Sequence, residues 1–292
     1  LEPAIFRTSV NRKEISYEVR LKTKDFADDI ATYLKFQKGN KGIIYCWRKI
    51  DVEELATKLK SCGFRAVGYH AGMSKETRTS IQNSWIKNEI DVLIATTAFG
   101  MGISKNDIRY VIHATMPHSI EGFYQESGRC GRDGKSATSI LYYSPKDSAA
   151  ISMILNKTVD YDRRKIAKAL FFQMGLYCKL QTCRRSFLLK YFGEEGCSKC
   201  GSCDICSSAH PSAHAQKIVD MPFPHTKKTK ISKYFAPHSA QTKKRVWKKE
   251  KDEEVKPMPI ARGQGILDYF QYLEKDEKKH TEKDRPLKRR KL

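Results

Sequence analysis

Short apolar segments alternate with amphipathic segments between residues 42 and 143 of this 292-residue chain. The first, Gly42 to Cys46, reads Gly-Ile-Ile-Tyr-Cys, which is typical of a strand buried on both faces. Strands that alternate with helices favour a parallel sheet covered by helices, so the sequence predicts an α/β fold. Further strands are expected at residues 15–19, 64–69, 91–95, 108–113 and 139–143.

In the sequence between these strands lie polar residues of the types that cap helices. Asp51, Ser74 and Ser119 each precede a helical pattern, and a further helix is expected over residues 24–36. Residues 145–192 are also expected to be helical. Their apolar stripes are Ile151, Ile154 and Leu155, and then Ile166, Leu170, Met174, Leu176 and Tyr177.

Residues 125–134 read Gln-Glu-Ser-Gly-Arg-Cys-Gly-Arg-Asp-Gly and place Arg129 and Arg132 three apart among three glycines. Glycine lets a backbone approach a ligand closely, and the planar guanidinium suits phosphate. In parallel sheets ligands bind at the carboxyl ends of the strands, and we expect the two arginines there. A solvated basic turn is the alternative interpretation.

The chain is strongly basic, with 55 Lys and Arg against 33 Asp and Glu and a net charge of +22. Such a balance is typical of proteins that bind nucleic acid or another acidic partner. No apolar run reaches the length of about 18 residues that a membrane span needs. Residues 208–292 are basic and aperiodic, and we predict that they are disordered. The first residue is not Met and no signal-peptide pattern follows, so we expect a fragment of a longer protein.

Four of the nine cysteines, Cys183, Cys200, Cys203 and Cys206, have the spacing C-x16-C-x2-C-x2-C. This spacing lets four thiolates surround one ion and predicts a structural zinc site in a reducing compartment. Cys197 is an alternative to Cys200, which is preferred because it supplies the first x2 step. An iron–sulfur cluster and plain buried thiols are the alternatives to zinc.

Several motifs in order resemble the C-terminal half of a RecQ-type DNA helicase core, over about residues 9 to 207. The resemblance implies a RecA-like parallel-sheet helicase lobe, a small helical zinc-binding module and a disordered basic tail. The implied boundaries are 1–40 for an inter-lobe connection and first helix, 41–156 for the lobe, 157–207 for the module and 208–292 for the tail. The motifs are Gly42–Cys46, Tyr69–Met73, Ala95–Ile103, Gln125–Gly134 and the segment from Cys183 to Cys206.

The resemblance also implies roles for individual residues. Arg132 matches the arginine finger, Arg129 its neighbour, and Gln125 the position that links nucleotide state to lobe closure. ATP and Mg²⁺ would be shared with a first lobe, and unwinding would run 3′ to 5′. The nucleotide-contacting candidates are Gly128, Arg129 and Arg132; the DNA-binding candidates are Thr96, Gly102, Tyr45 and His70.

The sequence departs from the family pattern in several places. Ser104 replaces the motif V carboxylate, Cys130 replaces an alanine, and Lys13-Glu14 replaces Pro-Asn. No G-x4-G-K-[S/T] or Asp-Glu-Ala-His box occurs, and both belong to the family's first lobe. We therefore expect the chain alone to be unable to hydrolyse ATP, and we see no winged-helix pattern after Cys206.

Two segments of the tail resemble the box through which proteins bind the sliding clamp. Each has an Ile followed at i+3 and i+4 by Tyr and Phe, which would share one face of a short helix. The Gln of that box is replaced by Lys228 and Gly263, and chance aromatic pairs are the alternative. The anchors are Ile231, Tyr234 and Phe235, and Ile266, Tyr269 and Phe270.

Residues 285–291 form a basic cluster that indicates a nuclear import receptor as partner and the nucleus as location. The same side chains would also attract DNA. Two interpretations of the whole chain remain open. It is part of an ATP-dependent DNA helicase acting in repair, recombination or replication, or it is a non-catalytic fragment that binds DNA and the clamp.

Overall fold

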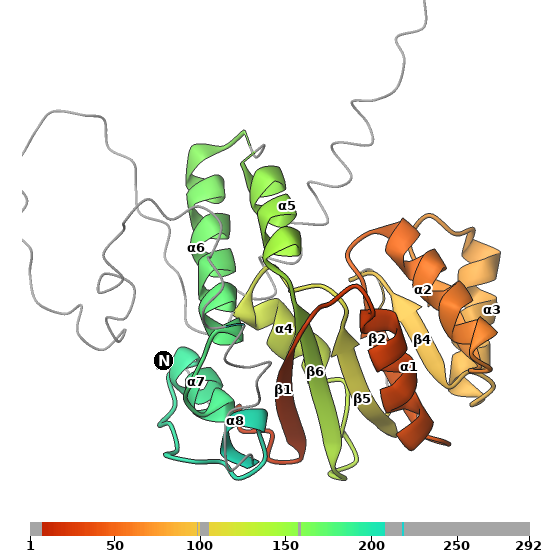
Figure 1. The fold of residues 1–292 in the computed structure, drawn as a ribbon, viewed down its shortest axis with the longest axis horizontal. Helices are drawn as coiled ribbons and strands as arrows, with labels where there is room; N and C mark the ends of the chain where they lie inside the picture. The colour runs from red at the N-terminus through yellow and green to blue at the C-terminus, as the bar shows by residue number, and fades with distance from the viewer. Residues whose placement is uncertain (1–7, 98, 100–104, 157–158, 208–217, 219–292) are drawn as a thin grey trace, which may run out of the picture. The chain divides into compact units, whose positions relative to one another are not determined.

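The computed structural model describes residues 8–97, 99, 105–156, 159–207 and 218. Within them, one parallel sheet has the strand order β1-β6-β5-β2-β4-β3, which confirms the predicted α/β architecture (Figure 1). All pairings between neighbouring strands are parallel. The strands are β1 (Ile15–Leu21), β2 (Lys41–Tyr45), β3 (Ala66–Tyr69), β4 (Val92–Ala95), β5 (Ile108–His113) and β6 (Ala137–Tyr143).

The helices are α1 (Phe26–Phe36), α2 (Lys49–Ser61), α3 (Lys75–Ile86), α4 (Ile120–Ser127), α5 (Pro145–Leu155), α6 (Tyr161–Cys178), α7 (Arg184–Tyr191) and α8 (Asp204–Ser207). Ser74 and Ser119 cap α3 and α4 as predicted. The prediction for Asp51 was wrong, because α2 already begins at Lys49. The Asp51 carboxylate instead accepts from the Arg48 amide at 3.3 Å, as the third residue of a capping box does. None of these helices is long and apolar enough to cross a membrane.

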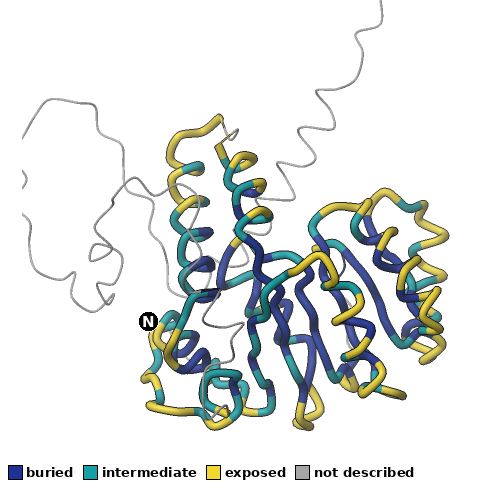
Figure 2. The backbone as a smooth tube through the Cα atoms, viewed as in Figure 1, coloured by how far each residue is buried: buried dark blue, intermediate teal, exposed yellow. Residues whose placement is uncertain are grey.

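Helices cover both faces of the sheet, and alternate residues of a strand point to opposite layers. Ile44 packs with the α1 and α2 side chains, among them Leu34 and Leu55. Ile43 and Tyr45 pack on the opposite face, where α4, α6 and α7 contribute apolar side chains. Figure 2 shows the strands buried between these layers.

The strand predicted at residues 15–19 forms one edge of the sheet. The β1 strand pairs with β6 along its whole length, from Ile15 opposite Ala137 to Leu21 opposite Tyr143. Periodicity predicted the strand but could not predict its partner, which lies more than a hundred residues away. Because β1 joins the sheet, the segment just before it is held against the loop that precedes β6.

Two residues of the predicted stripes in α5 and α6 are exposed. Ile154 is 47% exposed and Ile166 is 56% exposed, so the stripes are only partly covered. Ile151, Met174 and Tyr177, from the same stripes, are buried. The two helices extend past the sheet, and only the ends next to it are covered (Figure 2).

Replacing Gly42 by alanine should destabilise the fold by about 3 kcal/mol, as expected when a tight core is overpacked. A Cβ at this position would lie 1.9 Å from Cε2 of Tyr110, whose ring is fully buried. Urea unfolding would measure the change. Gly122→Ala is the matched control, because its Cβ would meet nothing closer than 3.6 Å. Equal stability of both variants would contradict the prediction.

Candidate arginine loop and metal centre

The arginine loop (residues 128–136) connects α4 to β6. It lies at the amino ends of the strands, and the amide of Gly131 donates to the carbonyl of Ile108, the first residue of β5, at 3.0 Å. The expected position at the carboxyl ends was therefore wrong. In a parallel sheet, a crossover helix returns the chain to the edge where the next strand begins. The arginine loop follows such a helix, so it lies at the amino ends of the strands.

Arg129 and Arg132 differ in exposure. Arg129 is 9% exposed, whereas Arg132 is exposed and its Nε donates to the Gly128 carbonyl at 3.4 Å. Burial, and then the charges of Arg129 and Arg12, lower the pKa of Arg132. An anion would relieve this repulsion between cations. Both arginines line a small cavity together with Ile43, Trp85, Phe99, Lys105 and Ile108.

The backbone of the arginine loop requires glycine at two turns. Gly131 and Gly134 have φ angles of +67° and +75°, a region that glycine tolerates best. A Cβ on Gly131 would also lie 3.0 Å from Cγ of Glu14, so the loop packs closely on the segment before β1. Cys130 is completely buried, and burial raises the pKa of its thiol to about 12. The position therefore holds a small neutral side chain.

Gly128 and Gln125 lie at the end of α4. Gly128 is the C-cap residue, and its carbonyl accepts from Nη1 of Arg12 at 3.1 Å. Gln125 is exposed on the last turn of the helix. Gln125, Gly128, Arg129 and Arg132 thus belong to one short segment, and the contact from Arg12 is one that the sequence patterns did not predict.

The carboxyl ends of β2, β3 and β4 bring three DNA-binding candidates to one edge of the sheet. Tyr45 ends β2, His70 follows β3 and Thr96 follows β4, with the Thr96 amide donating to the Tyr69 carbonyl at 3.3 Å. Thr96 is partly exposed. Gly102 and Ser104 lie outside the described residues.

Tyr45 and His70 are buried, at 3% and 5% exposure. The Tyr45 hydroxyl donates to the Phe99 carbonyl at 3.2 Å, and burial raises the pKa of this phenol above its ordinary value. His70 Nε2 lies 3.0 Å from Oε1 of Glu53. Both side chains pack the lobe in this structure, so Thr96 is the described candidate with surface for DNA.

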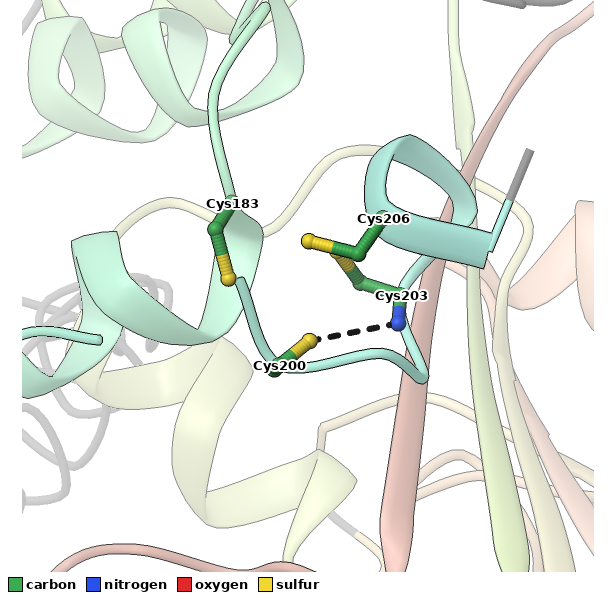
Figure 3. Close-up of side chains that lie close together, drawn as sticks. All are labelled: Cys183, Cys200, Cys203 and Cys206. Carbon is green, nitrogen blue, oxygen red and sulfur yellow. Dashed lines mark hydrogen bonds between the residues drawn. The ribbon is translucent and has the colours of Figure 1, made fainter. Parts of the chain in front are cut away.

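Four cysteine sulfurs gather beside the β1 edge of the sheet (Figure 3). The Sγ atoms of Cys183, Cys200, Cys203 and Cys206 all lie within 4.8 Å of one another. Tetrahedral zinc with bonds of about 2.3 Å would set sulfurs about 3.8 Å apart, which a small closure of this cluster reaches. Four thiol donors leave no open position, so the residues fit a structural zinc ion.

Local hydrogen bonds shape this cluster before any metal is considered. The Cys203 amide donates to Cys200 Sγ at 3.3 Å (Figure 3), and the Ser202 hydroxyl donates to it at 3.6 Å. Burial opposes ionisation of Cys200, but these bonds outweigh it and lower the pKa of the thiol to about 6. Cys197 Sγ lies 3.9 Å from Cys183 Sγ, but Cys197 does not belong to the group of four.

Buried charges fix the cysteine cluster to the sheet. Arg184 is 1% exposed, and its Nε donates to Oδ1 of Asp204 at 2.6 Å. The other oxygen of Asp204 accepts from the Val19 amide of β1 at 3.0 Å. The Ser16 hydroxyl also donates to the Ser202 carbonyl. The loop that carries Cys200, Cys203 and Cys206 (the metal loop) therefore lies along the edge of β1 that does not pair with β6.

Two known protein domains match the lobe and the cysteine cluster. Residues 25–134 match the helicase conserved C-terminal domain, and residues 145–207 match the RecQ zinc-binding domain. The first match begins just before α1, includes strands β2 to β5 and ends within the arginine loop. The second begins with α5 and ends after the fourth cysteine. The chain thus carries the C-terminal lobe of a helicase followed by a metal-binding module.

Several relatives of known name are helicases. The chain is 40% identical over 198 residues to the ATP-dependent DNA helicase RecQ of Haemophilus influenzae, covering 68% of this chain and 32% of that protein. It is 41% identical over 211 residues to the ATP-dependent DNA helicase Q1 of Pongo abelii, covering 69% and 31%. It is 38% identical to the ATP-dependent helicase SGS1 of Saccharomyces cerevisiae, covering 76% and 16%.

The chain belongs to the RecQ-type helicase family and corresponds to the C-terminal half of its core. It spans about a third of the length of the RecQ and Q1 relatives described above. Among solved structures it is similar to a DEAD box protein from Methanococcus jannaschii. That similarity has a TM-score of 0.44 and 24% identity, and it covers 56% of this chain and 41% of that one.

The remaining sequence predictions fall outside the described residues. Both clamp-like segments and the basic cluster at residues 285–291 belong to this part of the chain. They stay predictions from the sequence alone.

Proposed function

We propose that this chain supplies the second motor lobe of an ATP-dependent DNA helicase that unwinds DNA with 3′ to 5′ polarity. The observation that carries the proposal is the arginine loop, where Arg132 is exposed beside the buried Arg129 on a glycine-shaped turn. RecQ relatives are ATP-dependent DNA helicases, which supports the same reaction class.

In this proposal Arg132 extends from the lobe toward a nucleotide held by a first lobe. Its guanidinium stabilises charge on the phosphoryl group as the group is transferred, and the first lobe supplies the Mg²⁺ ligands. The second cation, Arg129, adds to the positive potential from a fixed position because it is buried. Gln125, one turn earlier on α4, is exposed on the same segment and contacts the partner lobe.

DNA contacts in this proposal go to the backbone and carry no base specificity. The Thr96 hydroxyl, at the carboxyl end of β4, and the backbone amide of Gly102 contact phosphate. The net charge of +22 favours association with the polyanion and makes it sensitive to salt. The zinc ion would be held by the four cysteines and would contribute folding energy, not chemistry.

An unwinding assay of the full-length natural protein tests the proposal. We expect ATP-dependent separation of a duplex with a 3′ single-stranded tail, and little separation when only a 5′ tail is present. Binding to DNA without DNA-stimulated ATP turnover would favour the alternative of a non-catalytic DNA-binding fragment.

The isolated 292-residue chain should not hydrolyse ATP at a measurable rate, because its sequence holds the finger but no Walker-type phosphate loop. A DNA-stimulated ATPase assay of the isolated chain measures this. Robust turnover that Arg132→Ala abolishes would show that a complete site exists within these residues.

Nuclear placement and clamp binding are finer parts of the proposal and rest on the sequence. The basic cluster at residues 285–291 supports import, and the repeated Ile-x-x-Tyr-Phe pattern supports docking in an apolar groove. Peptides spanning residues 226–240 and 261–275 can be titrated against the sliding clamp. Absence of saturable binding below about millimolar, the weak limit for a specific complex, would remove the clamp as partner.

A further inference from the structure

Arg12 contacts the arginine loop from the segment before β1. Its Nη1 donates to the Gly128 carbonyl at 3.1 Å, and its Nη2 donates to the Cys130 carbonyl at 3.0 Å. Its Nε pairs with Glu14, whose side chain packs on Gly131. One guanidinium therefore bridges two carbonyls that flank Arg129. These carbonyls lie at the end of α4, where helical partners run out.

Arg185 holds the backbone from which Arg12 extends. It is 6% exposed and lies in the first turn of α7. Its Nη1 donates to the Arg12 carbonyl, and its Nη2 donates to the carbonyls of Lys13 at 3.2 Å and Ile15 at 2.8 Å. A single buried side chain thus binds three carbonyls between Arg12 and the first residue of β1.

The same guanidinium reaches the metal loop. Nη2 of Arg185 donates to the Ser202 hydroxyl at 3.0 Å, and that hydroxyl donates to Cys200 Sγ at 3.6 Å. Arg185 also follows Cys183 by two residues, on the helix that Cys183 caps. Hydrogen bonds therefore link the Cys200 sulfur, through Ser202 and Arg185, to the backbone of Arg12, whose side chain binds the two carbonyls of the arginine loop.

We propose that Arg12 is a positioning residue for the arginine loop, and that Arg185 holds Arg12 in place from the metal-binding module. The catalytic part of this inference rests on the proposed function. A planar fork can bind two carbonyls at once, whereas the single ammonium of lysine cannot reproduce that geometry. Without the fork, the glycine-rich loop loses its fixed conformation and Arg132 loses its position.

Hydrogen exchange on the 292-residue chain tests the structural link without ATP. In Arg12→Ala, the amides of residues 129–131 should exchange about tenfold faster, the effect expected when the net stability of one or two hydrogen bonds is lost. Arg12→Lys should also accelerate exchange while it keeps the charge, and Arg185→Ala should act in the same direction.

Arg20→Ala is the matched control. Arg12 and Arg20 each have 25% exposed side chains, and each pairs with a glutamate two residues away, Glu14 and Glu18. Arg20 donates to the carboxylates of Glu18 and Asp29 and lies farther along β1. If Arg12→Ala and Arg12→Lys leave the exchange of residues 129–131 equal to that of Arg20→Ala, the link is overturned.

The catalytic consequence is measured in the full-length natural protein. Arg12→Lys should lower kcat for DNA-stimulated ATP hydrolysis about tenfold, with the KM for ATP and the zinc content unchanged. Unchanged kcat with accelerated loop exchange would overturn the positioning role. If even the unmodified protein lacks turnover, the proposed function fails, while the exchange result alone decides whether Arg12 fixes the loop.

Discussion

Arg132→Ala in the full-length natural protein is expected to reduce kcat for DNA-stimulated ATP hydrolysis by about 10³-fold or more, the range that arginine fingers supply in other nucleotidases. The Arg132 side chain is exposed and makes one long hydrogen bond, from Nε to the Gly128 carbonyl at 3.4 Å, so its loss should change the stability of the fold little. The affinity for DNA and the melting temperature should stay close to those of the unmodified protein. Steady-state kinetics with saturating DNA would measure the change.

Lys135→Ala provides the control for this variant. Lys135 is an exposed cation in the same loop, so its removal changes the local charge equally. It is expected to retain turnover within a few-fold of the unmodified protein. Equal losses in the two variants would show that net charge matters and that Arg132 has no specific role. Full activity of Arg132→Ala would rule out its assignment as the finger.

Cys203→Ser is expected to abolish stoichiometric zinc binding and to lower the melting temperature by about 10 °C or more, since metal binding in such modules is folding energy. The Cys203 side chain is completely buried among the four sulfurs. A serine hydroxyl is a poor zinc ligand at neutral pH, so the module loses the ion that closes it. Metal analysis of the purified protein and thermal unfolding measure both effects.

Cys62→Ser is the control for the loss of a thiol, because Cys62 is an exposed free cysteine far from the cluster in sequence. It should keep the zinc content and the melting temperature. A Cys203→Ser protein that still binds one zinc per chain would contradict the assigned ligand set. Cys197 would then be the residue to replace next, since its sulfur lies 3.9 Å from that of Cys183.

Features that depend on local sequence were predictable. Short apolar runs indicated the strands to within two residues of their observed ends. Ser74 and Ser119 marked the starts of two helices. The C-x2-C steps likewise brought their sulfurs together, because their spacing alone limits the distance between them. The prediction that Asp51 caps a helix was also wrong for a local reason, because aspartate is common both at the N-cap and at the third helical position.

Features that depend on long-range pairing were not predictable. Nothing in the segment around Arg12 indicates that β1 will pair with β6 and bring it to the arginine loop. Arg185 looks like a surface cation in sequence, yet it is buried and donates to carbonyls 170 and 172 residues earlier. Such contacts depend on the order of the strands in the sheet, and this order cannot be predicted from the local sequence.

The docking of Asp204 onto Val19 has a consequence for solubility. The outer side of β1 is a sheet edge, and an uncovered edge is a template for strands of other chains. The cysteine module occupies that side of the strand in the folded protein. If the metal stabilises this cover, expression with limited zinc should yield more aggregate than expression with zinc, which the soluble fraction of each preparation would measure.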